Sequence, residues 1–292
     1  GRRSCGLQRS DRAAPVIRRL PRGAVATAVV GVPLALGVAT AKDDHDAPPR
    51  AVHHGAPAVA PRPPRNIYAH DGAGMLSGAA RNAVSRVYVP NSDGGSVDVI
   101  DPTTARVVDH FDVGRNPQHI VPSWDLTRLY VTNDLSDTLT PIDPATGKVA
   151  GPDIPVNDPY NLYFTPDGSS AIVVAERLRR LDFRDPKTFA LQQSLPLKCR
   201  GVDHIDFAAD DTYLIATCEF SGQLVKVDLR TQSVVAYLDI GGKPQDIKLD
   251  PAGRVFYVAD MMAGGVHEID GAARRELAAT QPSGPEHLAA VA

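Results

Sequence analysis

Apolar residues from about residue 81 onward either run in short stretches or alternate with polar residues, which is the pattern of β-strands. One stretch of the chain carries four such runs, at 223–228, 234–240, 246–250 and 255–258. Turn-forming residues such as Gly241-Gly242 and Pro251-Ala252-Gly253 separate them. The pattern predicts an all-β protein of short antiparallel strands.

The same pattern recurs about every 42 residues. One column of it is occupied in five successive units, with steps of 42, 43, 42 and 41 residues, by Pro117-Gln118-His119-Ile120, Pro159-Tyr160-Asn161-Leu162, Val202-Asp203-His204-Ile205, Pro244-Gln245-Asp246-Ile247 and Pro285-Glu286-His287-Leu288. Two further columns keep the same register. Four short strands per unit of this length are typical of a β-propeller blade, so we predict a β-propeller of four-stranded blades with five repeats present.

A short sequence motif within the repeat matches a known repeat family. Leu129-Tyr130-Val131-Thr132-Asn133 is followed thirteen residues later by Ile142-Asp143-Pro144-Ala145-Thr146-Gly147. From about Arg81 to Ala292 the chain therefore resembles the YVTN-type β-propeller repeat family. The resemblance implies an exported or surface propeller, commonly with seven blades, and it does not fix a reaction.

Five units are fewer than the resemblance implies. We expect a chain truncated at its C-terminus, with an incomplete ring whose strand edges are exposed. The alternative is that a last strand, Glu286–Val291, pairs beside Arg86–Val89 and closes a ring of five blades.

The N-terminal third has a different composition. Residues 1–41 carry seven arginines against one acid, and an uncharged run, Gly23–Ala41, ends in the small-x-small pattern Ala39-Thr40-Ala41. This is typical of an export signal, with the route, general or twin-arginine, left open. Residues 42–80, rich in Pro, Ala and His, are predicted to be a flexible linker, and 81–292 the propeller. We expect an extracellular, cell-surface or periplasmic protein.

The net charge of the chain bears on which classes of binding partner are expected. The whole chain carries −3, and removal of residues 1–41 leaves −9. An acidic protein lacks the clustered cations that bind phosphates, so no nucleic-acid partner is expected. The apolar run is short and interrupted by Gly31, Pro33 and Gly37, so no stable membrane insertion is expected after signal cleavage.

The repeat brings polar side chains to one end of the blades. Since the innermost strand of a blade starts where its neighbour ends, these side chains should gather at one funnel mouth, and the ligand-binding candidates are His119, Asn161, His204, Glu219, Asp246 and His287. We predict that Glu219 lies across from Val202, which makes His204 its diagonal neighbour. His119, His204 and Glu219 are candidate ligands for a divalent metal cofactor, and a merely solvated rim is the plainer alternative.

Two cysteines, Cys199 and Cys218, flank one predicted hairpin. In an exported protein a disulfide is the first expectation, provided that Arg200-Gly201 folds back far enough to bring the Cα atoms together. Two reduced buried thiols, or thiolate ligands of a metal shared with His204, are the alternatives.

The functional expectation follows from these features. We expect an exported propeller that acts as a binding or scaffold protein, with its funnel face for a small ligand or a protein partner. No catalytic residues are assigned, because no constellation of nucleophile and base is forced by the spacing. The alternative is a metal-dependent enzyme or redox accessory protein with a His and carboxylate site at the channel mouth.

Overall fold

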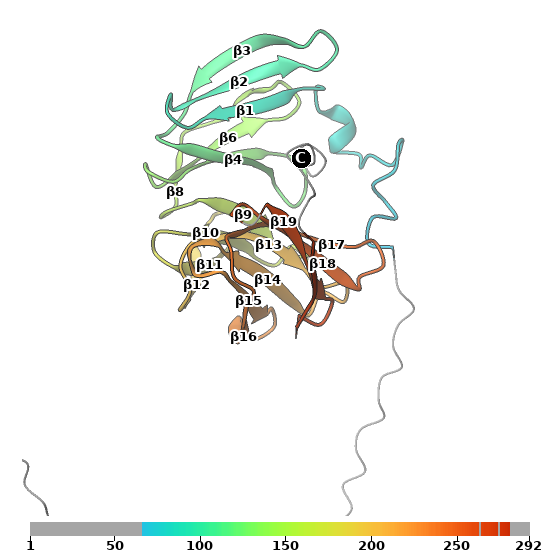
Figure 1. Cartoon of the computed structure of the whole chain (residues 1–292). Coiled ribbons are helices and arrows are strands. Elements are labelled where there is room, and N and C mark those ends of the chain that lie inside the picture. Colours follow the sequence, from blue (N-terminus) through green and yellow to red (C-terminus); the bar gives the residue numbers. More distant parts are fainter. Residues whose placement is uncertain (1–65, 263, 274, 281–292) are drawn as a thin grey trace, which may run out of the picture. The chain divides into compact units, whose positions relative to one another are not determined.

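Twenty β-strands and two short 3-10 helices form the regular structure of the described part of the chain (Figure 1). The structure is a computed structural model, and it describes residues 66–262, 264–273 and 275–280. All of these belong to one unit, Val59–Ala292. No helix among them is long and apolar enough to cross a membrane.

The strands form five antiparallel sheets that follow the chain order. The sheets consist of β1 (Val87–Asn91), β2 (Ser96–Asp101) and β3 (Arg106–Asp112); β4 (Pro117–Pro122), β5 (Leu129–Asn133), β6 (Thr138–Asp143), β7 (Lys148–Val149) and β8 (Ile154–Pro155); β9 (Asn161–Phe164), β10 (Ala171–Ala175), β11 (Arg180–Arg184) and β12 (Leu191–Pro196); β13 (Val202–Phe207), β14 (Tyr213–Cys218), β15 (Gln223–Asp228) and β16 (Ser233–Asp239); and β17 (Pro244–Leu249), β18 (Val255–Asp260), β19 (Gly265–Asp270) and β20 (Glu276–Thr280). The predicted all-β propeller fold of four-stranded blades is confirmed.

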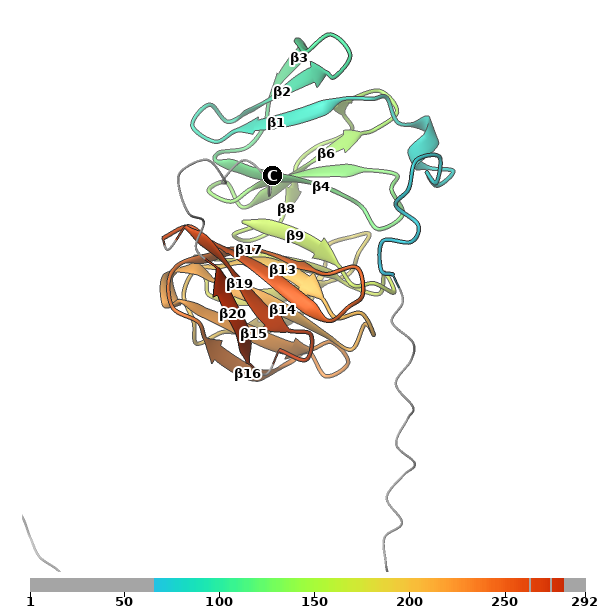
Figure 2. The same ribbon diagram turned by 45° about the vertical axis from the view of Figure 1, so that its right-hand side comes forward.

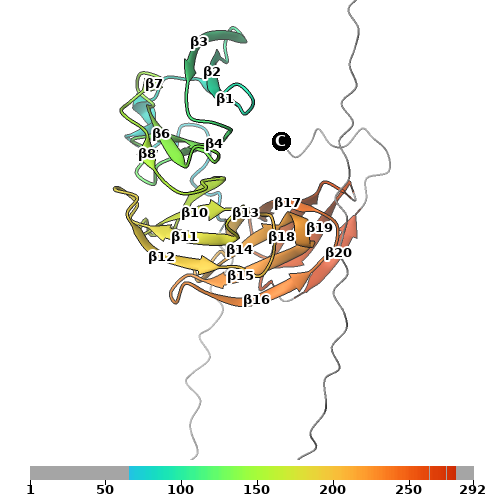
Figure 3. The same ribbon diagram turned by 90° about the vertical axis from the view of Figure 1, so that its left-hand side faces the viewer.

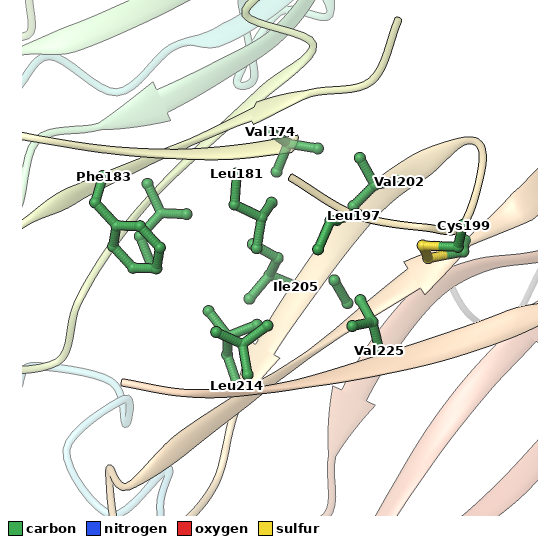
Figure 4. Packing of buried hydrophobic residues seen from close by; sticks show 13 residues of the cluster. Val174, Leu181, Phe183, Leu197, Cys199, Val202, Ile205, Leu214 and Val225 are labelled. Atoms are coloured by element: carbon green, nitrogen blue, oxygen red, sulfur yellow. A yellow bond between two sulfur atoms is a disulfide. The ribbon is translucent and has the colours of Figure 1, made fainter. Parts of the chain in front are cut away.

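Each pair of neighbouring sheets shares one hydrophobic cluster. The largest lies between the third and fourth sheets, where Phe183 and Leu181 pack against Ile205 and Leu214 (Figure 4). Three further clusters join the remaining neighbouring pairs of sheets. In Figure 3 the sheets succeed one another in chain order, with β13 and β17 toward the inside and β16 toward the outside.

The strands of the third sheet are apolar on both faces because both faces are covered by neighbouring sheets. Every residue of β10 is buried. Because alternate residues of a strand point to opposite faces, Ile172 and Val174 join the cluster with the fourth sheet while Ala171 and Val173 join the cluster with the second. Sheets covered on both faces need such continuous apolar runs, which is the pattern found in the sequence.

The first sheet differs from the others in its described part. It contains β1, β2 and β3 and no described counterpart of the first strand of the other four sheets. Val89 on β1 is 37% exposed, whereas Val131, its equivalent on β5, is fully buried. Glu286–Val291, the strand considered for this place, lies outside the described residues.

The chain before β1 lies against other sheets. The Ile67 amide donates to the Pro251 carbonyl, and the Tyr68 hydroxyl donates to the Leu249 carbonyl at the end of β17. The Val84 amide donates to the Pro144 carbonyl after β6, beyond the short helix η1 (Ala80–Asn82). The described part of the predicted linker, residues 66–80, thus makes specific contacts with the fifth sheet. Residues 1–65, with the predicted export signal, lie outside the described part.

Candidate functional site

The first strands of the second to fifth sheets are the inner strands β4, β9, β13 and β17, and they neighbour one another (Figure 2). Three of them contain a β-bulge at the same place. Their register shifts across Pro117–Ile120, Val202–Ile205 and Pro244–Ile247, so that one extra residue is inserted. A bulge re-aims the side chains that it carries. Here it carries Gln118-His119, Asp203-His204 and Gln245-Asp246, the polar column that the repeat identified.

Buried threonines hold two of these bulges. The His119 amide donates to Thr132 Oγ1 at 3.0 Å, and this hydroxyl donates to the Tyr160 carbonyl at 3.0 Å. The arrangement recurs two repeats later, where the His204 amide donates to Thr217 Oγ1 at 3.1 Å and the hydroxyl donates to the Gln245 carbonyl at 2.7 Å. Each threonine therefore ties one inner strand to the next.

Four side chains, three from the inner strands and one from the residue just before β9, contact one another, and we call His119, Tyr160, His204 and Gln245 the inner-strand cluster. The His119 ring lies edge-on to the rings of Tyr160 and His204, with centroids 5.2 and 5.3 Å apart. His119 Nδ1 donates to the Tyr160 carbonyl at 2.8 Å, and Gln245 Nε2 donates to the Tyr160 hydroxyl at 3.4 Å. Side chains from four neighbouring segments thus converge on one place.

The imidazoles of this cluster are neutral at physiological pH. Burial lowers the pKa of His119. Burial and the neighbouring His119 lower the pKa of His204 to about 4. Burial disfavours the charged form of a base, so both rings offer one hydrogen-bond donor and one acceptor.

Polar atoms in and beside the cluster are buried with no hydrogen-bond partner in the described part of the chain. They are His204 Nδ1, Gln245 Oε1 and Asp203 Oδ2. A buried polar atom without a partner costs free energy, and native structures contain few of them. These three atoms lie on neighbouring residues of the inner strands β13 and β17.

Carboxyl groups lie beside the cluster at the start of β13. Asp203 is 1% exposed. Burial, with the nearby Glu219 and Glu176, raises the pKa of Asp203 to about 9, and the Asp203 side chain hydrogen-bonds to Glu219. Burial and the negative charges nearby disfavour the ionised form, so Asp203 keeps its proton at neutral pH. Lys243 Nζ lies 3.6 Å from Glu219 Oε1 and supplies a balancing charge.

The predicted pairing of His204 with Glu219 is wrong by one residue of register. Cys218, not Glu219, lies across from Val202. Glu219 is the first residue of the short helix η2 (Glu219–Ser221), and its amide donates to the Gly201 carbonyl. Since neighbouring residues of a strand point to opposite sides, this shift places the Glu219 side chain beside Asp203 instead of His204. His204 faces His119 instead.

The other predicted site residues have separate positions. Asn161 is buried and bonds within its own strand, to the Tyr163 hydroxyl and the Leu162 amide. Asp246 is half-exposed, and its carboxylate accepts from the Ile247 amide while lying near both imidazoles. His287 lies outside the described residues.

The candidate metal ligands do not form one centre. His119 and His204 meet, but Glu219 contacts Asp203 and Lys243. Among the residues that the structure describes, no group of three or more His, Cys, Asp or Glu side chains is arranged to hold a metal ion.

A disulfide joins Cys199 to Cys218 beside this region, with Cα atoms 5.9 Å apart (Figure 4). The Arg200-Gly201 segment folds back to permit it, since the Phe220 amide donates to the Arg200 carbonyl. Gly201 has a φ of +69°, and a Cβ atom there would lie 2.7 Å from the Phe220 ring, so glycine fits both demands. Both sulfur atoms are engaged in this bond and do not serve as thiolate ligands.

Sequence reasoning missed Tyr160, Asp203 and Gln245 as partners, and Thr132 and Thr217 as their supports. The first three stand one residue before a predicted site residue in the same column. The two threonines occupy equivalent positions of β5 and β14, 85 residues apart, a spacing of two repeats. A search of the columns for buried polar residues, rather than for metal ligands alone, would have found them.

Comparison with known proteins identifies the fold family. The model of the YNCE-like beta-propeller family matches residues 56–271. Among solved structures, Kuenenia stuttgartiensis hydrazine synthase is similar with a TM-score of 0.50 and 18% identity, over 65% of this chain and 74% of that chain. Dihydro-heme d1 dehydrogenase NirN in complex with DHE is similar with a TM-score of 0.54 and 21% identity, over 68% of this chain and 45% of that chain. No curated protein matches. Identities this low show the fold alone, and the family match shows that the chain belongs to the YNCE-like β-propeller family.

Proposed function

We propose that this chain is a binding protein that holds a small polar ligand at the inner-strand cluster. The observation that carries the proposal is the set of buried atoms without partners, His204 Nδ1 and Gln245 Oε1, on side chains brought together by bulges in separate strands. A ligand that supplies hydrogen bonds to these atoms satisfies them, and each such bond favours binding. The proposed binding role assigns no catalytic residue.

The chemistry of the cluster selects the ligand class. Both imidazoles are neutral, and the raised pKa of Asp203 keeps that carboxyl protonated at neutral pH. Gln245 Oε1 requires a donor, and His204 Nδ1 accepts or donates according to its tautomer. We therefore infer an uncharged ligand that carries hydroxyl or amide groups.

Calorimetric titration with glucose, acetamide and uridine tests this role. We expect at least one of these probes to bind, and Gln245→Leu to weaken its binding about tenfold because one buried hydrogen bond is lost. Gln193→Leu is the matched control, since Gln193 lies on the outer strand β12 and is exposed. Absence of binding by every probe, or equal weakening in both variants, contradicts the proposal.

The rival function is a metal-dependent enzyme or a redox accessory protein. Its support is the meeting of two imidazoles, His119 and His204, with ring centroids 5.3 Å apart. Hydrazine synthase and the dehydrogenase NirN are enzymes, but their likeness to this chain concerns the fold. Elemental analysis of untagged protein after mild dialysis decides the matter. A stoichiometric transition metal favours the rival, and its absence removes it.

We also propose that the protein is exported. The basic segment followed by an uncharged run and Ala39-Thr40-Ala41 supports export, as does a disulfide, which persists in oxidising compartments. Mass spectrometry of protein recovered outside the cytoplasm tests this. We expect a mature N-terminus at Lys42, and an uncleaved protein confined to the cytoplasm contradicts the proposal.

A further inference from the structure

A cavity lies at the other end of the inner strands, where the turn after β4 in the second sheet approaches two turns of the third sheet. We call it the Trp124 groove. It has a volume of about 530 Å³, and it is lined by Ser123, Trp124, Asp125, Thr127, Arg128, Tyr130, Gly168, Pro186 and Lys187. Cavities of this size are typical of small-molecule sites. His119 stands near the start of β4 and this groove lies beyond its end, so the two sites are distinct.

The chain's single tryptophan forms a rigid wall of the groove. Trp124 is 54% exposed, yet its Nε1 donates to the Pro166 carbonyl at 3.2 Å. Its ring lies directly over Gly168, where a Cβ atom would come within 2.5 Å of the ring. The ring is therefore held in place from one side and left open on the other, which makes it a preformed stacking surface.

Two cations, Arg128 and Lys187, line the groove together with Trp124. Arg128 donates one hydrogen bond, from a terminal nitrogen to the Thr127 carbonyl. Lys187 interacts electrostatically with the carboxylates of Asp125 and Asp185 without an ion pair within 4 Å among the described residues, and both cationic side chains are exposed. The one carboxylate, Asp125, already accepts three hydrogen bonds, from the Ser123 hydroxyl and from the amide and hydroxyl of Thr127. Among the residues that line the groove there are thus two cations and one carboxylate.

The neighbouring sheets provide an internal comparison. An equivalent groove of about 400 Å³ lies one repeat later and is lined by Thr165, Pro166, Asp167, Ser169, Asp211, Leu229 and Arg230. We call it the Pro166 groove. Proline occupies the position of Trp124, and Asp211 occupies the position of Gly168. The aromatic wall and the glycine that admits it therefore belong to one groove of the pair, although the turn itself is shared.

We propose that the Trp124 groove binds an anionic ring compound, which stacks on Trp124 and directs its carboxylate or phosphate toward Arg128 and Lys187. Stacking on an indole face is common to sugar rings and aromatic rings, and the two cations select the anionic members of each class. This site goes beyond the ligand role proposed for the inner-strand cluster and does not depend on it.

The fluorescence of the single tryptophan reports on this groove directly. Trigalacturonate and benzoate are the anionic probes, and neutral maltotriose is the comparison. We expect a saturable change in emission with at least one anionic probe, weakened by salt, and little change with maltotriose. Which anionic probe binds distinguishes an acidic sugar from an aromatic acid. No saturable change with either anionic probe, or equal binding of maltotriose, overturns the proposal.

Matched variants locate the binding. Arg128→Gln and Lys187→Gln should each weaken it about tenfold, while Arg230→Gln in the Pro166 groove should leave it unchanged. Trp124→Pro, which copies the residue of the neighbouring turn, should abolish binding in calorimetry without unfolding the protein. Equal losses in Arg128→Gln and Arg230→Gln overturn the assignment. Gln245→Leu separates the two sites, because it should not alter binding in the Trp124 groove.

Discussion

The buried hydroxyl of Thr217 accepts a hydrogen bond of 3.1 Å from the amide of His204, at the bulge that turns this histidine toward His119. The same hydroxyl donates to the Gln245 carbonyl of the next inner strand at 2.7 Å. One side chain thus fixes the geometry of two members of the inner-strand cluster.

Replacing this hydroxyl by a methyl group should destabilise the protein. Thr217→Val keeps the volume of the side chain but leaves the His204 amide and the Gln245 carbonyl without a partner. We expect a loss of about 1–3 kcal/mol in the free energy of unfolding. Urea denaturation measures it. Thr231→Val, in an exposed turn, is the control with a smaller effect, and equal losses would contradict the role of Thr217.

The protonated state of Asp203 makes stability depend on pH. Because the pKa of Asp203 rises from 3.8 to about 9 in the folded protein, folding retains a proton that the unfolded chain releases. This contribution is complete below about pH 3.8 and is lost as the pH rises toward 9. Asp203→Asn should remove the loss, so the variant should gain stability over the wild type as the pH is raised. Denaturation curves at pH 5, 7 and 9 test this, with Asp93→Asn as the exposed control.

His267 should contribute in the same direction over a higher window. Burial acts to lower the pKa of His267, but hydrogen bonds to Asp260, at 3.0 Å, and Glu276, at 2.6 Å, outweigh it and leave the pKa raised. Its stabilisation is complete below about pH 6.5 and is lost as the pH passes the raised value. His267→Gln should reduce the fall in stability above pH 6.5 and leave the part that is due to Asp203. A wild type whose stability does not fall over this range would contradict the account.

The disulfide should stabilise the fourth sheet. Cys199 and Cys218 are 19 residues apart and both buried. Closing a loop of this length restricts the unfolded chain, and we expect Cys199→Ala combined with Cys218→Ala to cost about 3 kcal/mol. Comparison of urea midpoints for the variant and the wild type measures the loss. Equal midpoints would mean that the bond does not constrain the unfolded state.

The strands were predictable because their signal is local. Alternation and apolar runs set the four strands of a repeat, and the run at 223–228 coincides with β15. The polar column was also predictable, since equivalent positions of a repeat occupy equivalent places. His119 and His204 are two members of that column, and their rings are in contact.

Side-chain pairing was not predictable, because it depends on a single extra residue. The bulge in β13 and the turn at Gly201 move Glu219 from His204 to Asp203, and no residue type in the segment requires a bulge there. The contacts of Ile67 and Tyr68 with the fifth sheet are similarly invisible in the sequence. They join segments about 180 residues apart and leave no local pattern.

The side-chain nitrogen resonances of the histidines test the central claim most directly. His119 and His204 lie in the inner-strand cluster, and His110, on the exposed strand β3, is an internal reference. Titration of labelled protein with glucose, acetamide and uridine should shift the His119 and His204 resonances with at least one probe and leave His110 in place. If no probe moves the two resonances, or if His110 moves equally, the cluster is not the ligand site.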